Sequence, residues 1–169
     1  MPTRRSPNGY ANLDPAMNTK IENRKAYHDF FLQDRYEAGI ALLGCEVKSI
    51  REGRINLKDS FVRFLKGEAF LFNCHISAYS KIQGHVEIDP IRIRKLLLNR
   101  AELIQIETKL RPKGTTVVPT CMYFKKGRLK VEIAIAKGKQ EHDKRDTIRR
   151  KIHEKESQQA IKSHGRKQR

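Results

Sequence analysis

The chain has 169 residues, a formal net charge of +17 and a sequence pI of about 10.1. A chain of this length is expected to form one domain that buries a core without disulfides or a metal. The charge is larger than solubility requires and indicates a polyanionic partner: RNA, DNA or an anionic membrane. The membrane is the least favoured, because no apolar run approaches the roughly 20 residues of a spanning helix.

The N-terminal residues 1–22 are rich in Pro, Asn, Thr and Arg and show no apolar period, so we expect a flexible extension. The aromatic and apolar run YHDFFLQ (27–33) then predicts a strand. A short helix is expected over 34–44, since Asp34 is a suitable N-cap with Glu37 three residues later.

Strand patterns dominate the next stretch of sequence. Two strands are predicted over 45–52 and 55–65, around a turn at Gly53. Residues 61–72 read as a hairpin, with β-rich arms and a turn in which Gly67 is free to adopt positive φ.

Helix-start signals follow the first hairpin. The Asp-Pro pair at 89–90 predicts a helix over 90–98, with aspartate as N-cap and proline in the first turn. Asn99 and Glu102 form a capping box, which predicts a second helix over 100–110.

A second hairpin is expected over 120–136, turning at Gly127. Its second arm alternates apolar and polar residues over 129–136, the period of two of a half-buried strand. These elements together predict a mainly β fold over 23–136, a closed or nearly closed antiparallel barrel with helices packed outside it.

The C-terminal segment 137–169 is a basic tail, with twelve Lys/Arg against five Asp/Glu. Its apolar residues are few, mainly Ile148, Ile152 and Ile161, so it cannot bury enough surface to fold alone. On composition alone it is either a solubility tail or a second basic contact separate from the barrel.

Nothing in the sequence indicates catalysis. The His-Asp pairs at 28–29 and 142–143 lack the further ligands that a metal hydrolase needs, and His75 is expected to be an ordinary strand histidine. The cysteines Cys45, Cys74 and Cys121 fit no metal or redox spacing and indicate a reducing cytoplasm. No hydrophobic secretory segment occurs in the first 25 residues. We therefore expect a cytoplasmic, non-enzymatic protein without a cofactor.

Three basic motifs are candidate nucleic-acid contacts. They are NRKAY (23–27), EVKSIREGR (46–54) and RIRKLLLNR (92–100). Each alone is equally well explained as a solvated surface, but cations beside turns and predicted helix starts suit phosphate binding. Neighbouring aromatic residues could stack unpaired bases, although readout of phosphates and shape is the favoured mode.

The sequence resembles the SsrA-binding protein (small protein B) family of bacterial trans-translation. The resemblance rests on EAGIALLGCEVKSIREGRINLKDSFV, GEAFLFNCHISAY, DPIRIRKLLLN, VEIAIAKGK and HDKR, and it covers residues 23–162. It implies an oligonucleotide-binding (OB)-like β-barrel with three helices and a tail that is disordered until it becomes helical in the ribosome.

The resemblance also implies partners. They are transfer-messenger RNA, whose tRNA-like domain the protein would bind and help to charge with alanine, elongation factor Tu with GTP, and a stalled ribosome. The tail would enter the empty messenger channel at the decoding centre of the small subunit. We expect a monomeric adaptor with no membrane partner.

Matching positions give the expected contact residues. For transfer-messenger RNA they are Asn23, Arg24, Lys25, Glu37, Lys48, Ser49, Arg51, Leu97 and Asn99; for the ribosome they are Gly138, Lys139, His142, Asp143, Lys144, Arg145 and Ile161. For two of these residues the sequence leaves alternative roles open. Glu37 is either a helix cap or an acceptor for a base edge or 2′-OH, and Leu97 could equally be core. The alternative function is a basic barrel that binds structured rRNA as a ribosomal or assembly protein.

Overall fold

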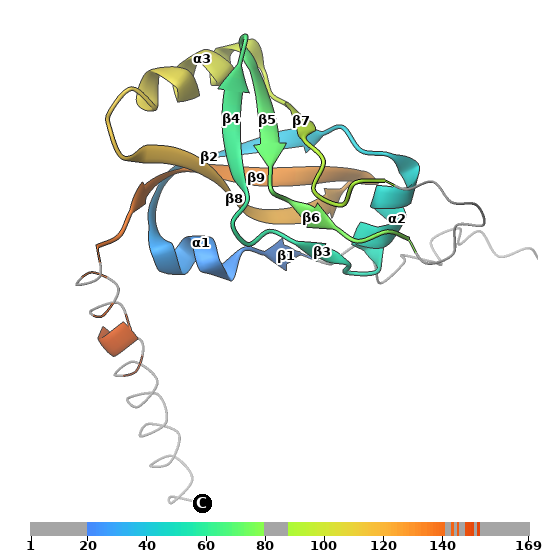
Figure 1. Cartoon of the computed structure of the whole chain (residues 1–169). Coiled ribbons are helices and arrows are strands. Elements are labelled where there is room, and N and C mark those ends of the chain that lie inside the picture. Colours follow the sequence, from blue (N-terminus) through green and yellow to red (C-terminus); the bar gives the residue numbers. More distant parts are fainter. Residues whose placement is uncertain are drawn as a thin grey trace, which may run out of the picture.

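The computed structural model describes residues 20–79, 88–140, 143, 145, 148–150 and 152 (Figure 1). In chain order the elements are β1 (Ile21–Glu22), α1 (Arg24–Asp29), β2 (Phe30–Ile40), α2 (Gly44–Arg51), β3 (Ile55–Asn56), β4 (Phe61–Leu65), β5 (Glu68–Phe72), β6 (His75–Ile76), β7 (Arg94–Leu97), α3 (Arg100–Lys109), β8 (Thr115–Lys125) and β9 (Arg128–Gly138).

The strands of the main sheet close into a ring. Their order is β1-β8-β4-β5-β7-β2-β9, neighbouring strands are antiparallel, and β8 also pairs with β9. The sheet therefore returns on itself from β9 to β8, with β1 added beside β8. The helices lie around this ring (Figure 1), so the predicted mainly β fold is confirmed.

Both predicted hairpins are present. β4 and β5 turn at Gly67, and β8 and β9 turn at Gly127; both glycines have positive φ, 74° and 73°. Short turns of this kind need a residue that adopts positive φ without steric cost. Helix α3 begins at the predicted capping box of Asn99 and Glu102.

Four predicted elements are wrong. The single strand expected over 55–65 is two strands, β3 and β4, which belong to different sheets. Residues 34–44, expected to be helical, belong mainly to strand β2, which also contains most of the strand expected over 27–33. Residues 45–52, expected to be a strand, form helix α2. The helix expected over 90–98 is replaced by a turn and strand β7.

The core fills the interior of the ring. It contains Leu71, Leu96, Val117, Val131 and Ile133, each at most 2% exposed, together with residues of several other strands. Helices α2 and α3 contribute the buried Ile50 and Ile106 to the same core. Among the described residues, every helix is too short or too polar to span a bilayer.

Candidate nucleic-acid interface

A groove of about 390 Å³ lies between the end of β2, helix α2 and the β8–β9 turn. It is lined by Gly39, Ile40, Leu42, Val47, Leu97, Phe124, Gly127, Arg128, Leu129 and Lys130. Its floor is apolar, while its edge carries cations. This pairing suits a ligand with both apolar and anionic parts.

Leu97 is an exposed wall of the groove and not part of the core. Its side chain is 55% exposed at the end of β7, opposite Gly39 of β2. A Cβ added to Gly39 would lie 3.2 Å from the Leu97 Cβ, so the glycine is what allows the leucine to sit so close to the sheet. Asn99, two residues further on, is exposed at the start of α3.

Glu37 is held at the rim of the groove by three neighbouring side chains. The hydroxyl of Tyr123 and the ammonium of Lys125 donate to its carboxylate, and Lys130, which lines the groove, lies 3.6 Å away. Hydrogen bonds from Lys125 and Tyr123 lower the pKa of Glu37 to about 2, and the same contact raises the pKa of Tyr123 to about 12. The helix-cap explanation for Glu37 is wrong, because the residue lies within strand β2.

Helix α2 presents two cations on one face. Lys48 and Arg51 are three residues apart and both exposed. The Lys48 ammonium lies 5.6 Å from the centre of the Tyr79 ring, and the Arg51 guanidinium lies 5.6 Å from that of Phe124. The ring faces attract these cations and limit their motion. Phe124 lines the groove, so its contact with Arg51 places that positive charge beside the groove.

Two expected contact residues are buried. Ser49 is fully buried in α2. Asn23, 3% exposed, caps α1 by accepting from the Ala26 N–H, and its amide donates to the carbonyls of Leu57 and Pro119, 2.9 Å each. These two residues therefore lie beneath the exposed cations of α2 and α1 and do not form part of the surface themselves. Arg24 and Lys25, which follow on α1, are exposed.

A buried ionic cluster that was not expected from the sequence fixes α2 to the start of β7 and to the chain just before it. Arg94 is fully buried and donates to Glu46 of α2 and to the carbonyls of Cys74, Pro90 and Arg92. The second arginine, Arg92, donates to both oxygens of Glu46. Arg92 and Arg94 are thus largely structural and not free phosphate contacts. The signal was the alternation in RIRKLLL, which puts Arg94 on the same face as the core residue Leu96.

The titration of Glu46 reflects this cluster. Burial acts to raise the pKa of the carboxyl, but hydrogen bonds from Arg92 and the Leu43 N–H, with the charge of Arg94, outweigh it and lower the pKa. The carboxylate therefore stays ionised, and α2 stays attached to β7 through it.

The first residues assigned to the tail belong to the body of the protein. Gly138 pairs with Phe30 at the end of β9. Lys139 donates through its backbone to Asp29 and through its ammonium to the Tyr27 carbonyl, and it lies over the Phe31 ring.

Beyond Gln140 the described tail residues have helical backbone: Asp143, Arg145, 148–150 and Ile152. The Asp143 carboxylate accepts from the Gln140 N–H at 3.1 Å, the reach-back contact of a helix start. His142, Lys144 and Ile161 lie outside the described residues. Within the described part of the chain, no group of three or more His, Cys, Asp or Glu could hold a metal ion.

Comparison with known proteins identifies relatives along most of the chain. The family model described as SmpB protein matches residues 20–163. An SsrA-binding protein of Coxiella burnetii (strain Dugway 5J108-111) is 47% identical over 151 residues, 89% of this chain and 95% of its own length. One of Nitratiruptor sp. is 50% identical over 149 residues, 88% and 99% of the two chains. A solved structure described as "tmRNA-SmpB: a journey to the center of the bacterial ribosome" has a TM-score of 0.63 at 43% identity, covering 78% of this chain and 95% of that one.

Proposed function

The chain belongs to the SmpB protein family, and from that premise we propose that it is an RNA-binding adaptor of trans-translation. It binds the tRNA-like domain of transfer-messenger RNA, promotes charging of that RNA with alanine, and accompanies it to stalled ribosomes with elongation factor Tu and GTP. It acts as a monomer in the bacterial cytoplasm and catalyses no reaction itself.

The observation that carries this proposal is the convergence at one groove of residues far apart in the sequence. Glu37, Arg51 and Leu97 come from β2, α2 and β7, and each lies in the groove lining or contacts a residue that does. Cations at the rim suit RNA phosphates, and the exposed leucine suits the face of an unpaired base. Glu37 would accept from a base edge or a 2′-OH.

The tail supplies the second contact. Its described helical residues Ile148 and Ile152 are 44% and 51% exposed, so this helix leaves its apolar side chains uncovered. A short helix without such packing is marginal in water. We propose that the tail forms a stable helix only when it is bound in the empty messenger channel. There, rRNA phosphates would neutralise its charge and the tail would contact the decoding centre.

Binding of the purified chain to the isolated tRNA-like domain, measured over a range of salt concentrations, tests the proposal. Affinity should fall steadily as salt rises, since phosphate contacts release counterions. The Lys48→Ala/Arg51→Ala variant should bind more weakly and show a shallower salt slope, while Leu97→Ala should weaken binding with the slope unchanged. Unchanged affinity in both variants would refute the groove as the RNA surface.

A further inference from the structure

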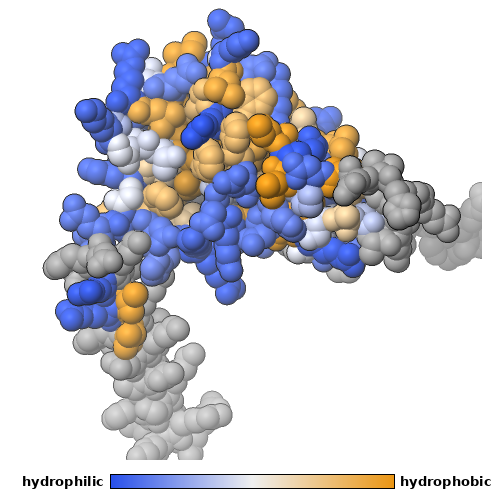
Figure 2. Space-filling model, viewed as in Figure 1, coloured by the Kyte–Doolittle hydropathy of each residue, from blue (hydrophilic) through white to orange (hydrophobic). Residues whose placement is uncertain are grey.

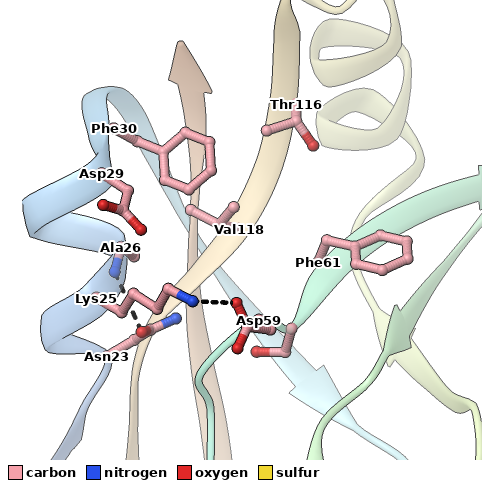
Figure 3. A pocket seen from close by; sticks show the side chains of 10 residues that line it. Asn23, Lys25, Ala26, Asp29, Phe30, Asp59, Phe61, Thr116 and Val118 are labelled. Atoms are coloured by element: carbon pink, nitrogen blue, oxygen red, sulfur yellow. Dashed lines mark hydrogen bonds and ion pairs between the residues drawn. The ribbon is translucent and has the colours of Figure 1, made fainter. Parts of the chain in front are cut away.

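A second pocket, of about 330 Å³, opens between helix α1 and the start of β4 (Figure 3). Its lining is Asn23, Lys25, Ala26, Asp29, Phe30, Asp59, Ser60, Phe61, Thr116 and Val118. The volume is at the lower end of the range for small-molecule sites, roughly 300–1,000 Å³. None of the groove residues described above belongs to this lining.

The side walls are aromatic. Phe30 and Phe61 stand on either side of Val118 and Thr116, which β8 places between them (Figure 3). Phe61 is held in place from behind by the Phe72 ring, whose centre lies 5.5 Å away at an angle of 7° between the planes. A fixed ring beside an apolar floor suits a flat heterocycle. Because the ring is already ordered, stacking on it loses little side-chain conformational entropy.

Arg63 adds a cation to this wall. Its guanidinium lies 5.2 Å from the centre of the Phe61 ring and 5.8 Å from that of Phe72. Arg63 is exposed on the β4–β5 hairpin, and in the region of that hairpin the surface carries both apolar and strongly hydrophilic side chains (Figure 2). A nucleotide chain that continued past Phe61 would meet a positive charge there.

The polar groups of the pocket favour a base edge over a phosphate. Asp29 and Asp59 bring two carboxylates to the lining, which repel an anion. One oxygen of Asp29 already contacts His28 Nδ1 at 2.8 Å, but a carboxylate has several acceptor positions and can also accept from an amino group. Lys25 donates to Asp59 across the mouth of the pocket, 2.5 Å apart (Figure 3). The ion pair is exposed, so the lysine can exchange this partner for a phosphate at little cost.

We propose that this pocket receives one unpaired RNA base that carries an exocyclic amino group, that is adenine, cytosine or guanine. The base stacks against Phe61, its amino group donates to Asp29 or Asp59, and its phosphate is met by Lys25. The inference rests on the proposed RNA-binding function and adds base-selective readout at a place separate from the groove. Asn23 contributes by fixing α1 as one wall of the pocket, since its amide joins that helix to the Leu57 and Pro119 carbonyls.

The test uses the full chain and short oligoribonucleotides of adenosine, cytidine or uridine, each labelled for fluorescence anisotropy at one fixed salt concentration. All three offer the same phosphates, so the difference between them reports the base. Uridine has no exocyclic amino group. We expect adenosine and cytidine oligonucleotides to bind about tenfold more tightly than the uridine one, the ratio that one hydrogen bond to a carboxylate supplies.

Two variants link this preference to the pocket. Thr116→Phe fills the space between the two phenylalanines and should remove the preference, leaving all three affinities near that for uridine. Thr115→Phe is its matched control, because Thr115 immediately precedes Thr116 in β8, is similarly half-exposed, and is not in the lining. Asp29→Asn keeps the size of the side chain while removing its charge, and it should reduce the preference even if Thr116→Phe does not fold.

Equal affinities of the wild-type chain for the three oligonucleotides, or no measurable binding of any of them, would overturn the pocket proposal. So would an equal loss of preference in Thr116→Phe and Thr115→Phe. Each of these three results is distinguishable from failure of the proposed function, because binding of the tRNA-like domain is measured separately with the Leu97 and α2 variants.

Discussion

Glu37 carries the clearest pH dependence at the scale of a single residue. Its pKa is lowered from an ordinary 4.5 to about 2, chiefly by the Lys125 and Tyr123 hydrogen bonds. A carboxyl with a depressed pKa in the folded state stabilises the fold above its unfolded pKa, and this contribution is lost as pH falls through the folded value. The Glu37→Gln variant should therefore be less stable than wild type at neutral pH and should converge with it near pH 2.

Thermal unfolding of both proteins between neutral pH and pH 2 measures this convergence. Tyr123→Phe is the control, since it removes one of the two main donors and should make the pH dependence smaller without abolishing it. A gap between wild type and Glu37→Gln that stays constant down to pH 2 would contradict the assignment.

Gly39 makes a second prediction at this scale. A Cβ at this position would come 3.2 Å from the Leu97 Cβ, so Gly39→Ala should push the leucine at the groove wall slightly out of its present position. We expect several-fold weaker binding of the tRNA-like domain with little loss of stability. Gly138→Ala is a matched control, because this glycine also lies in a strand and has nothing within 4 Å of an added Cβ. Similar affinities of the two variants would show that Leu97 packing is irrelevant to binding.

At the same scale, the sequence predicted exposed cations better than it predicted the roles of polar residues. Lys48 and Arg51 could be expected on the surface, because a solvated charge needs no partner. The buried roles of Asn23, Glu46 and Arg94 depend on partners between 20 and 96 residues away in the chain. The alternation in RIRKLLL could place Arg94 on the core face, but no local pattern contains these distant partners, so the contacts became visible only in the fold.

The incorrectly predicted elements show where tertiary contacts such as strand pairing override local secondary-structure propensity. The segment 34–44 contains Glu, Ala and Leu, which favour helices, yet β2 pairs with β9 along most of its length and with β7 at its end. The Asp-Pro start at 89–90 forms only a turn, in which the Asp89 side chain accepts from the Ile91 N–H at 2.9 Å. Helix α2 buries Glu46, Ser49 and Ile50. Their spacing of three and four residues puts them on one face of a helix, and burial of that face stabilises the helix despite its β-branched residues. Hairpins and α3 were predictable because their turns and caps are local.

The attachment of α2 to β7 gives a prediction at the element scale. Glu46→Ala would leave the fully buried Arg94 without its carboxylate, and removing one partner of a buried pair typically costs roughly 3–5 kcal/mol. Urea unfolding should show a loss of this order. Glu68→Ala is the control, because Glu68 pairs with Lys95 at the surface, where both side chains are more than 40% exposed and such pairs contribute about 1 kcal/mol or less. Comparable losses in the two variants would refute a structural role for the cluster.

Across the whole molecule, positive charge is divided between a closed barrel and a projecting tail. The barrel ends at Lys139, which donates hydrogen bonds to the backbone carbonyls of Tyr27 and Asp29. The described tail residues then lead away from the ring (Figure 1). The sequence predicted this division from charge and apolar content, but only the β9 pairing shows that Gly138 and Lys139 belong to the barrel. A truncation meant to isolate the tail must therefore keep both residues.

A chain that ends at Gln140 should consequently bind the isolated tRNA-like domain with nearly unchanged affinity, because the groove, α2 and the Lys139 anchor are all retained. The same chain should fail to support tagging of peptides on stalled ribosomes, because the basic tail that would enter the messenger channel is gone. The matched control is a full-length chain with Ile148→Ser and Ile152→Ser, which keeps the tail's charge and removes exposed apolar side chains from its helix. If those side chains pack in the ribosome, this variant should tag poorly while binding the RNA normally. Loss of RNA binding by the truncated chain would instead show that one basic surface serves both partners, and the division between barrel and tail would be wrong.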